Sequence, residues 1–146
     1  MTLQELVDRV TARGGFTAAS GVTTVVVEPG RVDASLQKKP ELLQYSGYFH
    51  GGVVSGLADH AAGAAVTTLL PPGRIALTVD LHVTFLAPAD GEALLAKATT
   101  VRAGTTLGVA TVEVCVLQDG AESVCATATA MFRVIDVPPD LREPSR

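Results

Sequence analysis

Two adjacent ionisable side chains, Asp59 and His60, stand in a stretch that is otherwise uncharged over residues 51–73. A carboxylate is costly to bury among small and apolar residues unless it is paired, hydrogen-bonded or protonated. A chain that keeps one there usually has a use for it, and a carboxylate can act as a nucleophile or as a general base. Asp59 is therefore the first candidate catalytic residue.

A second place for chemistry is the start of the same stretch, His50-Gly51-Gly52. Residues 51–70 have the length of a helix, which Pro71-Pro72-Gly73 would end. The first N–H groups of a helix lack intrahelical partners and carry the positive end of its dipole. Glycine lets a ligand approach those groups closely, so this helix start favours an oxygen that carries negative charge.

The composition indicates one domain with a real core and argues against several classes of function. The chain has 146 residues, of which 47% are hydrophobic, and a formal net charge of −4. Neither a disordered chain nor a nucleic-acid-binding surface fits these values. We expect no cofactor and no metal ion, since Cys115 and Cys125 lack a zinc-site spacing and are expected to be free thiols on adjacent strands.

We expect no signal peptide in the first residues, because no basic segment precedes an apolar one there. The apolar window over residues 53–70 approaches the length of a membrane span, but Asp59 and His60 lie in its middle. We therefore expect a cytoplasmic protein with reduced cysteines and no membrane partner.

The elements that must position these residues can be predicted from the hydrophobic pattern. The first residues predict an amphipathic helix that a Thr2–Glu5 capping box starts and Gly14-Gly15 ends, with one apolar face made of Leu3, Leu6, Val7 and Val10. Strands are predicted over 21–28, 31–37, 75–85, 92–101, 106–117 and 123–135. Residues 38–49 are expected to form a loop, and residues 137–146 a loose tail.

The strand after the long helix shows the clearest period of two. Its apolar residues alternate with polar or small ones and are expected to share one buried face: Ile75, Leu77, Val79, Leu81, Val83 and Phe85. A change of phase near Val109-Ala110 indicates a bulge in a later strand. We expect the last four strands to form an antiparallel meander that the one long helix covers, which is an α+β architecture with a sheet wrapped around a central helix.

This arrangement is that of the hotdog fold. His50-Gly51-Gly52 followed by Asp59, together with the strand and turn over residues 78–92, resembles the PaaI-type (phenylacetate-pathway) acyl-CoA thioesterases. The resemblance covers about residues 22–132 and implies a single hotdog thioesterase domain over residues 1–146.

The resemblance implies a role for each candidate residue in thioester hydrolysis. The Gly51 N–H and the side-chain amide of Gln44 would polarise the thioester carbonyl, and Asp59 would be the nucleophile or the general base. Thr78 would hold that carboxylate or orient the attacking water, since Gly63 lacks the hydroxyl that one branch of these enzymes carries there. Structural roles stay open for the same residues: a solvated Gln44, an ordinary strand Thr78, or an Asp59 bonded to Ser55 or Thr78.

The three histidines receive weaker roles. His50 could act as a base, but its position before the helix favours holding the helix start by hydrogen bonds. His60 lies about 100° around the helix from Asp59, so the two side chains diverge and His60 is expected to pack or bond elsewhere. His82 is expected on the face of a strand.

The geometry of a helix adds a constraint that does not depend on the resemblance to a known family. Gly51 and Asp59 are separated by a rise of about 12 Å, since each helical residue advances about 1.5 Å. Asp59 therefore cannot attack a carbonyl that its own Gly51 holds, and a site that uses both must combine two chains. We expect at least a homodimer, and a homotetramer is favoured by the apolar composition.

A CoA substrate also needs contacts to its phosphates and pantetheine arm. Arg102 is the first candidate, ahead of Lys97 and Arg74, because the family often carries a basic residue near Gly104, where this chain has Thr105 and Thr106. Gly52, Val53, Arg102 and Gly104 complete the expected substrate-binding set. The departure near Gly104 leaves another pantetheine thioester open as the substrate.

Three functions compete on this evidence. The first is hydrolysis of acyl-CoA, including aryl-acyl-CoA, and the second is a non-catalytic hotdog dimer that binds acyl-CoA as a sensor or accessory protein. The third is a hotdog dehydratase acting on 3-hydroxyacyl thioesters, which the placement of the His50-Gly51-Gly52 motif fits poorly. The identity of the acyl group cannot be predicted from these residues.

Overall fold

The structure is a computed structural model that describes residues 1–139 and 142. Its elements in chain order are α1 (Leu3–Arg13), α2 (Gly15–Ser20), β1 (Thr23–Glu28), β2 (Arg31–Gln37), the short 3-10 helix η1 (Pro40–Leu42), α3 (Gly51–Thr67), β3 (Arg74–Phe85), β4 (Ala93–Ala103), β5 (Leu107–Gln118) and β6 (Ala121–Asp136). Both predicted helices and all six predicted strands are present, with small shifts in their boundaries. The predicted tail over residues 137–146 lies largely outside the described residues.

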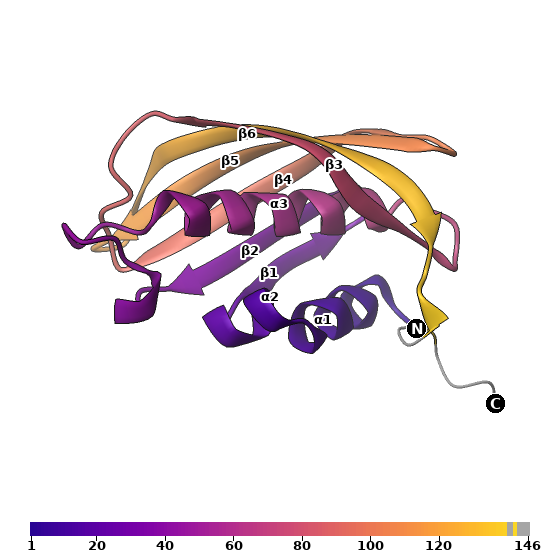
Figure 1. Ribbon diagram of the computed structural model, residues 1–146, viewed down its shortest axis with the longest axis horizontal. Helices are drawn as coiled ribbons and strands as arrows, with labels where there is room; N and C mark the ends of the chain where they lie inside the picture. Colours follow the sequence, from indigo (N-terminus) through magenta and orange to yellow (C-terminus); the bar gives the residue numbers. More distant parts are fainter. Residues whose placement is uncertain (140–141, 143–146) are drawn as a thin grey trace.

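The strands form one antiparallel sheet in the order β1-β2-β4-β5-β6-β3. Figure 1 shows this sheet curving over α3, with α1 and α2 below. The expected α+β hotdog architecture, a sheet wrapped around one central helix, is therefore confirmed.

The predicted meander of the last four strands is wrong for β3. This strand pairs with β6 at the far edge of the sheet, and β4 enters beside β2 instead. The connection between them crosses the ends of two strands, where Leu86 N–H donates to the carbonyl of Cys125 and Glu92 N–H to that of Leu117. A connection that returns across the sheet end leaves β3 paired on one side only.

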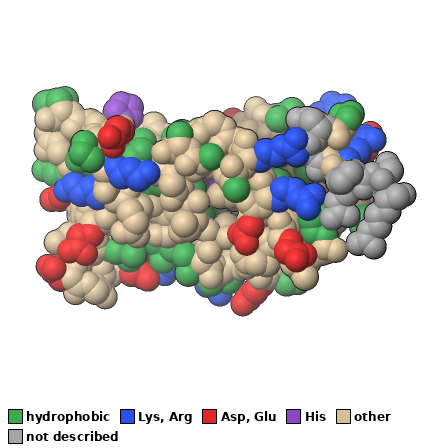
Figure 2. Space-filling view, turned by 90° about the horizontal axis from the view of Figure 1, so that it is seen from below, with side chains coloured by type: hydrophobic (Ala, Val, Ile, Leu, Met, Phe, Trp, Pro, Cys, Tyr) green, Lys and Arg blue, Asp and Glu red, His purple; other side chains and the backbone are tan. Residues whose placement is uncertain are grey.

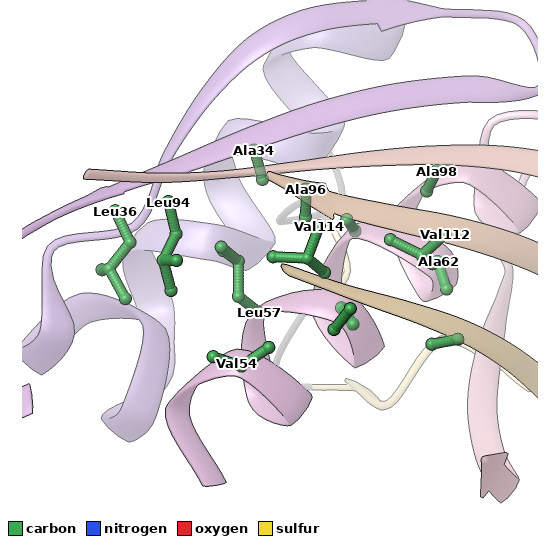
Figure 3. Packing of buried hydrophobic residues seen from close by; sticks show 14 of the residues in the cluster. Ala34, Leu36, Val54, Leu57, Ala62, Leu94, Ala96, Ala98, Val112 and Val114 are labelled. Atoms are coloured by element: carbon green, nitrogen blue, oxygen red, sulfur yellow. The ribbon is translucent and has the colours of Figure 1, made fainter. Parts of the chain in front are cut away.

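The core forms where α3 lies against the inner face of the sheet. Figure 3 shows Val54, Leu57 and Ala62 of the helix among inward side chains of β2, β4 and β5, which include Leu36, Leu94, Ala96, Val112 and Val114. Many of the helix's contact residues are alanines, which let its backbone approach the sheet closely. One side of α3 is therefore buried against the sheet, and the residues on its other side remain available for other contacts.

A bulge in β3 interrupts the predicted period-two pattern of burial. The register against β6 shifts between Thr78 and Asp80, which leaves Val79 as the extra residue. Ala76 packs on the core before the bulge, and Leu81 and Val83 do so after it. Leu77 and Val79, predicted to be buried, are instead 54% and 55% exposed.

The irregularity that was predicted near Val109-Ala110 is present, but the extra residue lies on the neighbouring strand. Thr100 pairs with Ala110 and Arg102 with Val109, so Val101 of β4 is the residue without a partner in the register. The bulge predicted in β5 is therefore wrong: this strand keeps its alternation, with Gly108, Ala110 and Val112 buried in turn, and the extra residue belongs to β4. A sequence pattern cannot say which of two paired strands carries the insertion.

The N-terminal helix begins as predicted. Thr2 Oγ1 accepts from Glu5 N–H, and Glu5 Oε2 accepts from Thr2 N–H, which together make the capping box. The helix ends at Arg13, but the chain then turns directly into α2, which the sequence did not predict. Gly21 closes α2 in the left-handed region at φ 81°.

The face that carries α1 and α2 is uneven in charge. Figure 2 shows most of the visible lysine and arginine side chains toward the two ends of this face, with Asp and Glu side chains among and between them. Within residues 1–139 and 142, no helix has both the length and the apolar character needed to cross a membrane.

A buried hydroxyl on β4 provides a test of the packing. Thr100 Oγ1 is buried without a hydrogen-bond partner among the described residues, and an unsatisfied polar group of this kind costs about 1–3 kcal/mol. Replacing the hydroxyl by a methyl group in Thr100→Val should raise the free energy of unfolding by about 1 kcal/mol, measured by urea denaturation. Thr99→Val, on the exposed neighbour, is the control and should change stability by less than about 0.5 kcal/mol.

Candidate active site

The start of α3 is built by His50 and the glycines after it. His50 is the N-cap, and its Nδ1 accepts from Gly52 N–H at 2.9 Å. The carbonyl of His50 accepts from the N–H groups of Val53 and Val54. Gly51 N–H has no hydrogen-bond partner among residues 1–139 and 142, so this donor is left at the positive end of the helix. His50 thus has the structural role that its position before the helix favoured.

Gln44 is held beside this helix start by a tight turn. Its N–H donates to the carbonyl of Tyr48 at 2.9 Å, and Gly47, at φ 90°, donates to the carbonyl of Gln44 at 3.0 Å. The side-chain Oε1 accepts from Ser46 N–H at 2.5 Å and from Ser46 Oγ at 2.7 Å. Both bonds go to the oxygen, so neither uses the two N–H donors on Nε2 at the other end of the amide.

Gln44 and Gly51 line the same recess, whose volume is about 400 Å³. The other walls come from the loop before α3, from α3 itself, from the end of β3 with its adjoining turn, and from β6: Tyr48, Phe49, Val54, Phe85, Leu86, Ala87, Pro88, Ala89 and Cys125. A Cβ atom at position 51 would lie 3.4 Å from the ring of Phe85. Glycine therefore keeps the backbone N–H accessible from the recess.

Asp59 lies further along α3 and is held by β3. Thr78 Oγ1 donates to Asp59 Oδ1 at 2.6 Å. Thr78 can reach the helix because it lies on the inward face of β3 just before the bulge at Val79. Asp59 is half-buried and lines a second recess of about 160 Å³, so its carboxylate is fixed by a hydroxyl and partly withdrawn from water.

His60 forms its hydrogen bond with α1, as expected for a side chain directed away from Asp59. Its Nε2 lies 2.8 Å from Thr11 Oγ1, and that hydroxyl donates to the carbonyl of Val7. The hydroxyl's single proton is thereby used, so His60 is the donor to Thr11. Burial lowers the pKa of His60, and the nearby charge of Asp59 opposes this only in part.

The two recesses lie at different places along α3. One contains Gln44 and Gly51, the other contains Asp59 and Thr78, and they share no lining residue. The helix rise between Gly51 and Asp59 is about 12 Å. One chain therefore presents two separate groups of candidate residues, each holding part of what the proposed chemistry requires.

The predicted substrate-binding residues lie outside both recesses. Gly52 and Val53 are in the first turn of α3, and Arg102 and Gly104 are at the end of β4. The guanidinium of Arg102 lies beside Gly104, where an added Cβ would be 3.4 Å from its Nε. The structure therefore brings Arg102 and Gly104 together, but neither residue lines either recess.

The alternative cations are already paired. Lys97 Nζ lies 2.5 Å from Glu122 Oε2, and Arg74 Nη1 lies 2.7 Å from Asp136 Oδ1. Within the described part of the chain, no three His, Cys, Asp or Glu side chains gather as a metal site would need. Cys115 and Cys125 are free and buried, and burial raises the pKa of Cys125 to about 11.

Several residues that complete these recesses could not be singled out from the sequence. Ser46 orients Gln44, Phe85 faces Gly51, and Leu6 and Val10 of α1 line the recess beside Asp59. The apolar face of α1 could be predicted from the sequence, but the surface on which it packs could not. An apolar stripe indicates that a helix face is buried and does not identify the elements that cover it.

Comparison with known proteins agrees with this architecture. The family model described as the thioesterase superfamily matches residues 46–123. A solved structure of a thioesterase family protein from Silicibacter pomeroyi shares 34% identity and superposes with a TM-score of 0.89, covering 93% of this chain and all of that one. The chain belongs to the thioesterase superfamily, and the resemblance inferred from its sequence is confirmed at that level.

Two curated relatives match shorter segments. A protein of Halobacterium salinarum named as a candidate esterase is 43% identical over 93 residues, 60% of this chain and 61% of that protein. The 1,4-dihydroxy-2-naphthoyl-CoA hydrolase of Listeria monocytogenes is 29% identical over 90 residues, 62% of this chain and 73% of that enzyme. The match thus spans less than two thirds of the Halobacterium relative's length.

The environment of His60 predicts how stability depends on pH. Since burial lowers its pKa below the ordinary 6.5, the unfolded chain takes up a proton that the folded chain resists. His60 therefore stabilises the fold above about pH 6.5, and this contribution is lost as the pH falls through the folded pKa. His60→Gln keeps a donor for Thr11 and should flatten the fall in melting temperature below pH 6.5. An unchanged pH profile in this variant would contradict the assignment.

Proposed function

We propose that this protein hydrolyses acyl-CoA thioesters, aryl-acyl-CoA included, to a free acid and CoA. The observation that carries the proposal is the pairing of two features on one helix. Its N-terminus presents an N–H that has no partner in the described part of the chain, beside an oriented amide, and its middle presents a carboxylate fixed by a hydroxyl. Membership of the thioesterase superfamily and the CoA hydrolase named among the relatives support the same chemistry.

In the proposed mechanism the thioester carbonyl binds at the start of α3. The Gly51 N–H and the Nε2 of Gln44 donate to its oxygen, where negative charge develops when the carbonyl carbon is attacked. Preorganised donors of this kind act most strongly on the transition state because their dipoles are already aligned. His50 supports the step by holding the first turn of the helix.

Asp59 carries out the attack or activates water for it. As a nucleophile, its carboxylate adds to the carbonyl carbon, the CoA thiolate leaves, and water then hydrolyses the resulting anhydride. As a general base, it takes a proton from the water that attacks, and the proton passes to the departing thiolate. In both routes the bond from Thr78 holds one carboxylate oxygen, which leaves the other for the reaction.

The proposed site is shared between two protomers. The helix rise keeps Asp59 too far from its own Gly51, so a second chain must supply one of them. The outer edge of β3 is suited to this, because among the described strands β3 pairs only with β6, and it carries the exposed side chains of Leu77 and Val79. Antiparallel pairing of two β3 edges would place this strand of one chain beside the same strand of the other.

Contacts to the CoA portion are proposed for Gly52 and Val53 at the helix start and for Arg102 with Gly104 at the end of β4. Arg102 is exposed and its charge is available to a phosphate at the surface. The cytoplasmic location expected from the sequence, and a dimer or tetramer as the working form, belong to the same proposal.

The carboxylate is tested by Asp59→Asn. This change keeps the shape of the side chain and removes both its charge and its basicity, so kcat on acyl-CoA should fall by about 10²–10⁴-fold. Release of free thiol measures the rate, and the melting temperature checks the fold. The control is Asp119→Asn at the β5–β6 turn, where Asn suits the positive φ. Normal turnover in Asp59→Asn would overturn the mechanism, and tight acyl-CoA binding without turnover in the wild type would favour the sensor alternative.

Mixing two inactive variants tests whether the site is shared. A heterodimer of Asp59→Asn with Gln44→Ala would contain one doubly altered site and one intact site, if each site combines two chains. Refolding equal amounts together should therefore restore about a quarter of wild-type activity. If Asp59 and Gln44 of the same chain acted together, every site would be altered and the mixture would stay inactive.

A further inference from the structure

The recess beside Asp59 has an outer wall made by α1. Three residues of this helix, Leu6, Val7 and Val10, face it, and the opposite walls come from α3, β3 and β6: Gly63, Ala64, Thr67, Ile75, Ala76 and Phe132. Apart from Asp59, His60, Thr67 and Thr78, the lining is apolar or glycine. The carboxylate thus stands at the border of an apolar space that a separate helix closes.

The size of this space is that of a compact group. Its volume is about 160 Å³, and an apolar protein cavity of about 150 Å³ is large enough to hold one benzene molecule. Gly63 helps to keep the space open, since a Cβ atom there would lie 3.2 Å from the ring of Phe132. A long alkyl chain is larger than this volume, so part of it would lie outside the recess.

Specific hydrogen bonds hold α1 in place on two sides. Toward β1, Asp8 Oδ1 accepts from Thr24 Oγ1 at 2.5 Å. Toward α3, the buried Thr11 accepts from His60 Nε2 at 2.8 Å. The second bond joins α1 to the residue directly after Asp59, so it fixes the distance between the wall and the carboxylate.

We propose that α1 is a selectivity wall. Leu6 and Val10 restrict the acyl group to a compact apolar one, about the size of a single ring, and Thr11 acts as a positioning residue through His60. The inference rests on the proposed thioesterase function: when the carbonyl carbon lies against Asp59, the acyl carbons extend into the recess and the CoA arm extends away from it. The wall belongs to the chain that supplies Asp59, not to the chain that supplies Gly51.

Two changes at one position test the wall in opposite directions. The measurement is kcat/KM for benzoyl-CoA and decanoyl-CoA. Leu6→Ala should raise the decanoyl-to-benzoyl ratio about tenfold or more, since one methylene group in a hydrophobic pocket is worth about 10–200-fold in specificity. Leu6→Phe should lower that ratio. Leu3→Ala makes the same truncation one turn earlier, on a residue that does not line the Asp59 recess, and should leave the ratio unchanged.

The positioning role needs a matched pair of variants. Thr11→Val removes the acceptor for His60 at nearly constant volume, and Thr11→Ser keeps it. We expect Thr11→Val to raise KM for benzoyl-CoA several-fold with a smaller change in kcat, and Thr11→Ser to retain wild-type values. A purely stabilising bond would lower the melting temperature of Thr11→Val without changing its KM for benzoyl-CoA, which would overturn the positioning role.

The outcomes separate this inference from the function on which it rests. A wild-type protein that hydrolyses no thioester of the panel would overturn both. An active wild type whose Leu6→Ala profile equals that of Leu3→Ala would overturn the wall alone. If Leu6→Ala fails to fold, Val10→Ala, at a position that is 38% exposed, makes the same test with less loss of packing.

Discussion

The hydrogen bond from Thr78 to Asp59 ties the central helix to the edge strand of the sheet, and the candidate site depends on it. It exists because β3 contains a bulge at Val79. In an unbroken strand, residues of one parity would face the core along the whole length. The bulge turns Thr78 inward before it and Leu81 and Val83 inward after it, so one strand supplies both a polar partner for the carboxylate and an apolar surface for the core. The same irregularity directs Leu77 and Val79 outward along the free edge.

The composition of α3 reflects a second constraint, which is close packing on both sides. Gly56 lies against the ring of Phe16 from α2, and Gly63 against the ring of Phe132 from β6. A Cβ atom at position 56 would be 2.8 Å from the ring of Phe16. Glycine, which has a poor helix propensity, is therefore needed here for the ring to pack against the helix. Glycine costs about 1 kcal/mol relative to alanine inside a helix. The helix is stable here because the sheet and the two N-terminal helices enclose it.

Much of this architecture could be predicted from particular residues. The Thr2–Glu5 capping box, the Pro71-Pro72-Gly73 stop and the long alternating strands are local signals, and each has a direct physical cause. The order of strands could not be predicted, since a period-two pattern is the same whether β3 lies beside β4 or beside β6. The second helix was missed because Gly14-Gly15 signals the end of one helix and carries no signal for the start of another. For the site, Asp59, Thr78, Gln44 and Gly51 could be singled out, but the place where α1 docks could not, because it depends on tertiary contacts such as that between Thr11 and His60.

The rigidity of α3 connects these constraints to function. A loop between Gly51 and Asp59 could fold back and bring both to one substrate, but a helix pinned by the sheet along its length cannot shorten. Its rise keeps the Gly51 N–H at the helix start and the Asp59 carboxylate about 12 Å apart. On the proposed function, the protein gains a complete site only by placing the start of one helix beside the middle of another, and an antiparallel pair of chains would do this twice at once. On the proposed function, a chain that folds normally but stays alone would therefore hold every required residue and still lack a working site.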